Sequence, residues 1–182
     1  MHSLRPLFLG VLAMAIVVAV SNVAVGYPIN DWITWGALTY PVAFLVTDVM
    51  NRSFGASNAR KVVYGGFLVG VVLSIWLADV RIALASGTAF LTAQLIDIFV
   101  FNRISKKTWW QAPFISSSLS SAIDTVLFFS IAFIGSGLPW VSWAVGDYAV
   151  KLAMAILLLV PFKVVISMIK IHATVVPRDT TP

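Results

Sequence analysis

Cysteine and glutamate are absent from this sequence of 182 residues, and histidine occurs only at positions 2 and 172. Without cysteine, the chain can form no disulfide, no thiolate metal site and no cysteine nucleophile. The two histidines lie at opposite ends of the chain, which argues against His-based metal sites and acid–base catalysis. These absences predict a protein that is not an enzyme, binds no metal and carries no cofactor.

Charged residues are also scarce. They make up 10% of the sequence, whereas hydrophobic residues make up 60%. A soluble domain of this size would need far more charge to cover its surface, so the composition indicates an integral membrane protein surrounded by the lipid bilayer. The formal net charge is +5, but most of the basic residues lie between apolar runs, where they act as topology signals. We therefore expect no nucleic-acid partner.

The sequence contains long apolar runs. A helix needs about 20 apolar residues to cross a bilayer, and six runs approach that length. They predict an all-α integral membrane protein, a compact bundle of six transmembrane helices that forms a single domain over residues 1–182. The first run follows Arg5 and is long for a signal peptide, so it is expected to remain as a helix. The predicted spans lie near residues 7–26, 32–50, 61–79, 82–102, 113–135 and 146–169.

The basic residues predict how this bundle is oriented. Nearly all of them fall on one side of the predicted spans, and Arg81 is the exception between spans on the other side. The positive-inside rule then places both termini of this multi-pass protein in the cytoplasm. The residues that give this signal are Arg52, Arg60, Lys61, Arg103, Lys106, Lys107, Lys170 and Arg178.

Three aspartates interrupt the apolar runs: Asp48, Asp97 and Asp124. A carboxylate at membrane depth costs several kcal/mol unless it has a partner, so each is a candidate functional residue. At about 1.5 Å of rise per residue, Asp97 lies about 9 Å inside the cytoplasmic end of its span and Asp124 lies about 16 Å deep. Gln94 is one turn deeper than Asp97 on the same face. We therefore expect Gln94 and Asp124 to face each other across a shared cavity.

Further polar and aromatic residues recur at helical spacings around these acids. Pro41 in the second span is able to open the backbone, which is tolerated at membrane depth where a cavity or a neighbour satisfies the freed groups. Carboxylates and amides bind N–H donors and mixed hydrogen-bonding edges, and aromatic faces stack on flat rings. This inventory favours a planar, nitrogen-rich heterocycle such as a purine-like base. The candidate substrate-binding residues are Asp48, Gln94, Asp97, Asp124, Asn51, Phe44, Phe90 and Ser121.

Structural explanations compete with this functional one. Asp48 and Asn51 are near a membrane interface and could hydrate the end of their helix, and Asp97 could pair with Arg103. Asp147 and Lys151 are four residues apart on the sixth span, the spacing of an ion pair on one helix face.

Several segments resemble the VUT family of vitamin uptake transporters, whose bacterial members import queuosine precursors. The most specific are Thr39-Tyr-Pro-Val-Ala-Phe-Leu-Val-Thr-Asp48 and Ser121-Ala-Ile-Asp-Thr-Val-Leu-Phe-Phe129, and the likeness covers nearly the whole chain. The resemblance implies uptake of 7-deazaguanines such as preQ0 or preQ1, the precursors of a modified tRNA nucleoside, for salvage. It also implies that the protein lies in a bacterial inner (cytoplasmic) membrane. Many family members carry an acid where this chain has Arg52, so no role is transferred at that position.

The source of energy and the assembly stay open. The chain has no Walker motif, so ATP could act only through an energising partner, as in the substrate-binding component of a multi-subunit importer. Proton coupling through Asp97 or Asp124, and facilitated diffusion, are the alternatives. A non-transporting scaffold, in which polar residues only hold helices together, is a further one. The Gly66–Gly70 spacing offers a packing face either for a homodimer or inside the monomer.

Overall fold

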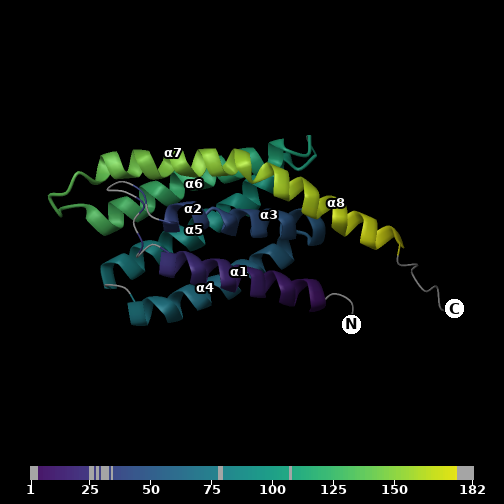
Figure 1. Ribbon diagram of the computed structural model, residues 1–182, viewed down its shortest axis with the longest axis horizontal. Coiled ribbons are helices and arrows are strands. Elements are labelled where there is room, and N and C mark those ends of the chain that lie inside the picture. The colour runs from purple at the N-terminus through teal and green to yellow at the C-terminus, as the bar shows by residue number, and fades with distance from the viewer. Residues whose placement is uncertain are drawn as a thin grey trace.

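The computed structural model describes residues 4–24, 27, 29, 33, 35–77, 80–106 and 108–175. All regular secondary structure in these ranges is α-helical, which confirms the predicted all-α class (Figure 1). In chain order the helices are α1 (Leu4–Ala24), α2 (Trp35–Thr39), α3 (Val42–Phe54), α4 (Ala56–Leu77), α5 (Val80–Ile104), α6 (Gln111–Phe133), α7 (Trp140–Leu157) and α8 (Leu159–Val175).

Four stretches of the described helices are long and apolar enough to cross a membrane: Arg5–Ala24, Val80–Ile104, Gln111–Phe133 and Trp140–Ile169. They overlap the first, fourth, fifth and sixth predicted spans, and together they make this a multi-pass helical membrane protein. The second predicted span corresponds to α2 and α3, and the third to α4. Several predictions lie outside the described residues: the span ends at 26, 32 and 79, His2, Lys107 and Arg178, and the side chains of Lys170 and His172.

Two of the predicted spans are interrupted beside a proline. α2 ends at Thr39 and α3 begins at Val42, because Pro41 has no N–H to continue the helical hydrogen bonds. A turn replaces them, in which the Ala43 N–H donates to the Tyr40 carbonyl at 3.0 Å. The sixth span changes from α7 to α8 at Leu158, three residues before Pro161. The expectation that Pro41 opens the backbone is confirmed, and the break near Pro161 is a second one.

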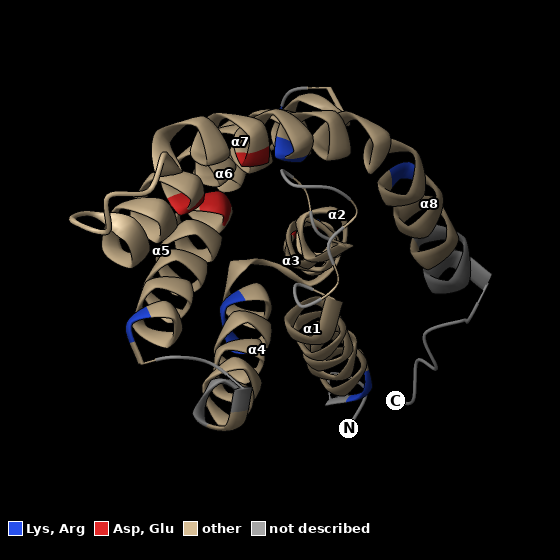
Figure 2. Cartoon of the chain, turned by 60° about the vertical axis from the view of Figure 1, so that its left-hand side comes forward, with Lys and Arg blue, Asp and Glu red and all other residues tan. Residues whose placement is uncertain are grey.

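α3 lies inside the bundle. Figure 2 shows it surrounded by the other helices, and it contacts α1, α4, α5, α6 and α8. Its polar residues Thr47, Asp48 and Asn51 are therefore buried together with its apolar ones. A short helix that is enclosed on all sides brings polar side chains to the centre of the protein, where neighbouring helices must supply their partners.

Glycines let α1 and α4 approach each other closely. A Cβ atom on Gly65 would lie 2.9 Å from a methyl group of Val11, one on Gly66 would collide with Met14, and Gly70 lies against Val18. Small residues allow this kind of approach between transmembrane helices. The Gly66–Gly70 face is therefore used inside the monomer, so the spacing gives no support to a homodimer.

We expect Gly66→Ala to lower the stability of the folded protein by about 1–3 kcal/mol, because the added methyl group overpacks the contact with Met14. Gly146→Ala is the matched control, since nothing lies within 4 Å of a Cβ atom added there on α7. Thermal unfolding of the purified protein in detergent compares the two variants. Equal unfolding temperatures for both would contradict the close α1–α4 packing.

Candidate substrate site

A small cavity lies between α3, α6, α7 and α8, and its volume is about 20 Å³. This is room for a single water molecule, so a purine-sized ring needs the helices to move apart. Three of the predicted site residues, Phe44, Asp48 and Ser121, line the cavity. Its complete lining is Pro41, Phe44, Leu45, Asp48, Pro113, Ser117, Ser121, Lys151, Ala155, Leu158, Leu159 and Phe162.

One wall of the cavity carries a pair of carboxyl groups. Asp48 accepts a hydrogen bond from the Ser117 hydroxyl at 3.2 Å through Oδ2, and its Oδ1 has no partner among the described residues. Asp97 of α5 lies behind it, close enough for a hydrogen bond between the two carboxyl groups, with Ser116 beside both. The exposed fractions of Asp48 and Asp97 are 2% and 0%. The structure thus brings these two predicted residues together without an ion-pairing cation in the described part of the chain.

The opposite wall carries a compensated cluster of charges. The ammonium group of Lys151 lies 2.7 Å from Asp124 Oδ2 and 2.5 Å from Asp147 Oδ2. The Tyr40 hydroxyl donates to Asp124 Oδ1 at 2.9 Å, and the Thr125 hydroxyl donates to Asp147 at 2.7 Å. Both oxygens of Asp124 are therefore occupied by protein groups. The predicted ion pair between Asp147 and Lys151 is confirmed, and Asp124 joins it.

Gln94 does not face Asp124, as the sequence had suggested it would. Its Oε1 accepts a hydrogen bond of 2.6 Å from the Thr47 hydroxyl of α3, and its Nε2 has no partner among the described residues. Neither Gln94, Asp97 nor Asp124 lines the cavity. The three lie behind its walls, because the helices are rotated so that Ser117 and Lys151 point into the space instead.

Aromatic rings pack against one another beside the cavity, and one of them, Phe44, lines it. The ring of Tyr40 packs edge-to-face against Phe44 at 6.4 Å and against Phe90 at 6.3 Å between centroids. The ammonium group of Lys151 lies 5.5 Å from the centre of the Tyr40 ring. Phe44 therefore reaches the cavity directly, whereas Phe90 supports it from behind Tyr40.

Asn51 links two helices. Its side chain donates to the Ile98 carbonyl at 3.4 Å and accepts from the Asn102 amide at 3.2 Å, so it joins α3 to α5. Arg103, the alternative partner of Asp97, is exposed and lies over the ring of Phe99 at 5.1 Å. No ion pair joins Arg103 to Asp97 in the part of the chain that the structure describes.

Lys151 is the functional candidate that sequence reasoning missed. The sixth span was expected to begin at residue 146, which put Lys151 near the membrane surface. The helix begins at Trp140, so Lys151 is eleven residues, or about 16 Å, from its start. A basic residue at that depth is as strong a signal as a buried acid, and the same rule applied to Lys151 would have found it.

Buried acids, a buried lysine and a small central cavity among membrane-crossing helices define a multi-pass membrane protein with a polar interior site. The profile of the family described as "Putative vitamin uptake transporter" matches residues 34–80 and 75–166, and the chain belongs to this family. Its members are transporters and not enzymes, in agreement with the prediction from composition. No solved structure matches the chain.

Three curated relatives carry names of one kind. The "Probable queuosine precursor transporter" of Haemophilus influenzae is 39% identical over 154 residues, which cover 70% of this chain and 66% of that relative. The "Queuosine precursor transporter" of Escherichia coli is 30% identical over 175 residues, covering 80% of this chain and 79% of its own length. The Bacillus subtilis relative, "Probable queuosine precursor transporter", is 27% identical over 154 residues, covering 68% of this chain and 67% of its own length.

We expect Lys151→Met to lower the free energy of unfolding by about 3–5 kcal/mol, because it leaves the buried Asp124 and the partly buried Asp147 without their cation. Lys163→Met is the matched control. Lys163 is exposed over the Trp109 ring at 4.7 Å, and such a contact contributes about 0.5–1 kcal/mol. Unfolding of both variants in detergent, followed by tryptophan fluorescence, measures the difference. Equal losses would show that the Lys151 cluster is not what holds α6 and α7 together.

Proposed function

We propose that this protein imports queuosine precursors, 7-deazaguanines such as preQ0 or preQ1, across the bacterial inner membrane for the salvage of tRNA modification. Three relatives bear the name of queuosine precursor transporter, and the layout of the cavity supports the same substrate class. The observation that carries the proposal is that an anionic acceptor, Asp48, and a cationic donor, Lys151, line one small cavity.

A 7-deazaguanine ring presents the complementary pattern along one edge. Its O6 is an acceptor, and its N1–H and N2–H₂ groups are donors side by side. A carboxylate accepts two adjacent N–H groups, and an ammonium group donates to a carbonyl oxygen. In the proposed complex, Asp48 accepts from N1–H and N2–H₂. Lys151 keeps its two carboxylate partners and donates to O6 in place of its 3.1 Å bond to the Thr125 hydroxyl. Asp48 Oδ1 has no partner in the closed state among the described residues, so it is free to take one of these bonds.

The other cavity residues complete the proposed site. Ser117 and Ser121 add hydroxyl groups on α6, and Phe44 and Phe162 add aromatic surface on opposite sides that suits a flat ring. Asp124 and Asp147 hold the Lys151 ammonium group in place. Gln94, Phe90 and Asn51 act from behind the wall, by fixing how α3 and α5 meet.

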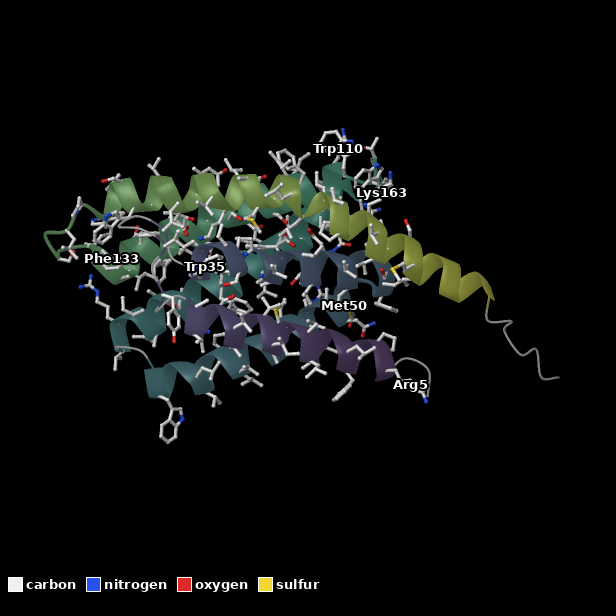
Figure 3. All side chains as sticks on the ribbon, viewed as in Figure 1. Arg5, Trp35, Met50, Trp110, Phe133 and Lys163 are labelled. Atoms are coloured by element: carbon white, nitrogen blue, oxygen red, sulfur yellow. The ribbon has the colours of Figure 1, made fainter. Side chains whose placement is uncertain are left out.

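The proposed topology has six membrane spans with both termini in the cytoplasm. Figure 3 shows Arg5 and Lys163 toward the same end of the bundle and Trp35 and Phe133 toward the other. Basic residues at one end agree with the positive-inside rule for that end as the cytoplasmic one. The closed cavity lies between the two helix breaks, so opening toward either side requires α2–α3 or α7–α8 to bend.

The substrate pattern is tested with two ligands of the same shape. 7-Deazaguanine and 7-deazaadenine share one ring system, but the second has no O6 acceptor and no N1–H donor. We expect 7-deazaguanine, preQ0 and preQ1 to raise the unfolding temperature of the purified protein, whereas 7-deazaadenine does not. A ligand at a hundredfold excess over its Kd stabilises by about 2.7 kcal/mol. Equal shifts with both 7-deazapurines would contradict recognition through Asp48 and Lys151.

Three variants locate the site. Asp48→Asn should weaken binding of 7-deazaguanine by about 10- to 150-fold, since a hydrogen bond to a charged group contributes about 1.5–3 kcal/mol. Ser117→Ala should weaken binding because it removes the donor to Asp48 and a wall of the cavity. Ser118→Ala is its matched control, a neighbouring serine that does not line the cavity. Equal effects of Ser117→Ala and Ser118→Ala would place the ligand elsewhere.

Counterflow of labelled preQ0 in proteoliposomes separates the competing functions. Exchange by the purified chain supports a complete transporter. Binding without exchange would instead identify the substrate-binding component of a multi-subunit importer. If a folded sample shows neither binding nor exchange, the scaffold is the remaining function and the proposal is overturned.

A further inference from the structure

The paired carboxyl groups of Asp48 and Asp97 are the least compensated feature of the interior. They come from adjacent helices, α3 and α5. The Ser117 hydroxyl donates to Asp48 Oδ2 at 3.2 Å, and Ser116 and Ser117 lie beside both carboxyl groups. Within the part of the chain that the structure describes, Asp48 Oδ1 and both oxygens of Asp97 are buried without a hydrogen-bond partner, and so is the Ser120 hydroxyl on α6. An orphaned polar atom in a protein interior indicates a missing ligand, a proton or a stored strain.

Among the described residues of the surrounding helices, no cation forms an ion pair with Asp48 or Asp97. Arg52 follows Asp48 by one turn of α3, but it donates to the Ser105 carbonyl at 2.9 Å and lies 5.0 Å from the centre of the Phe101 ring. Lys151 lines the same cavity as Asp48 and is engaged by Asp124 and Asp147. Arg52 Nε and Nη2 are buried without a hydrogen-bond partner among the described residues, yet this guanidinium group forms no ion pair with Asp48 there. The side chains that α6 places beside the pair are serines.

Two adjacent carboxylates cannot both stay ionised in a site that excludes water, because the repulsion adds to the loss of solvation. One shared proton removes one charge and turns an oxygen of the pair into a donor for the other carboxylate. The two groups then satisfy each other, which accounts for their close approach. A proton fits this site without any additional space. A metal ion would need further ligands, and no third acidic or histidine side chain joins the pair in the described ranges.

We propose that Asp48 and Asp97 hold one proton that is co-transported with the substrate. This inference rests on the proposed function, and it adds the coupling ion and the residue that carries it. The two acids differ in access, since Asp48 lines the cavity and Asp97 lies behind it. When the substrate donates N1–H and N2–H₂ to Asp48, this group must be a carboxylate. The O–H bond on Asp48 then breaks and an O–H bond forms on Asp97.

Substrate and proton therefore strengthen each other's binding. A neutral Asp97 removes the charge that would oppose an ionised Asp48, and a substrate on Asp48 drives the proton to Asp97. By linkage, the factor by which the proton tightens substrate binding equals the factor by which the substrate tightens proton binding, about 5- to 150-fold for typical couplings. When the substrate leaves for the cytoplasm, the ionised Asp48 no longer has its N–H partners and again competes with Asp97 for the proton. The proton is then bound less tightly and also leaves to the cytoplasm.

The test uses preQ0, a neutral probe, and the full-length protein in proteoliposomes. With the outside one pH unit more acidic than the inside, we expect the protein to concentrate preQ0 up to about tenfold, since one pH unit is a tenfold proton ratio. Each uptake should acidify the lumen, as read by trapped pyranine. A sodium gradient of the same size, with equal pH on both sides, should give no accumulation.

Asp97→Asn should keep preQ0 counterflow, which needs no net proton movement, while accumulation and lumenal acidification fall to the level of empty liposomes. Asp97→Glu restores a titratable group and should restore both. Asp147→Asn makes the same chemical change at an acid that has Lys151 as its partner. It should retain the dependence on the pH gradient even where its transport rate changes.

The outcomes separate the two proposals. Counterflow by the wild type without accumulation or acidification would overturn proton coupling and leave the proposed function intact. Accumulation driven by the sodium gradient would identify a different coupling ion and would also overturn it. A gradient response that survives in Asp97→Asn, or that disappears equally in Asp147→Asn, would show that the proton is not on this pair. Absence of wild-type counterflow would refute the proposed function and this inference with it.

Discussion

The ammonium group of Lys151 is the interaction on which the arrangement of the interior depends. It binds Asp124 of α6 and Asp147 of α7, and through Asp124 it reaches Tyr40, which lies at the break between α2 and α3. One cation therefore connects three parts of the chain at membrane depth. In lipid there is no water to replace a lost partner, so these helices have no second way to satisfy both acids.

The Lys151 cluster has a partner for each of its acids, and it can be compared with the Asp48–Asp97 pair across the cavity, which does not. Asp124 and Asp147 meet one lysine, a tyrosine and a threonine, whereas Asp48 and Asp97 meet each other and serines. The two clusters differ in their partners, since Lys151 supplies a cation to one of them. They also differ in exposure, since the side chain of Asp147 is 19% exposed whereas Asp97 is fully buried. A cluster whose hydrogen bonds are complete holds a structure together, and one with orphaned oxygens is ready to accept something. The architecture and the binding chemistry are therefore carried by different acids.

The sequence predicted those features that a single helix determines. Apolar run lengths predicted the helical class, and the rule for intramembrane charges selected Asp48, Asp97 and Asp124, all of which are buried. The missing N–H of Pro41 predicted the break before α3. Each of these follows from the composition of one segment, without knowledge of its neighbours.

Features that depend on two helices were harder to predict. Gln94 was expected to face Asp124, but it pairs with Thr47, because periodicity gives the face of a helix and not the helix that this face meets. The depth of Lys151 depended on where α7 begins, and a shift from residue 146 to Trp140 moved it from the interface to the interior. Whether the Gly66–Gly70 face packs inside or between monomers likewise became visible only with α1 beside it.

The cavity also explains why both helix breaks lie where they do. Pro41 lines it from α3's side, and Leu158 and Leu159, at the junction of α7 and α8, line it from the other. At each break the helical hydrogen bonds are already interrupted, so bending there disrupts fewer of them than bending a continuous helix. Phe162, one turn beyond the α7–α8 junction, packs edge-to-face on Phe101 at 6.5 Å and closes the cavity from α8. The cavity has room for one water, and a helix break lies on each of two of its walls. We expect motion at these breaks to make the space for a flat ring, while the Lys151 cluster keeps α6 and α7 in register.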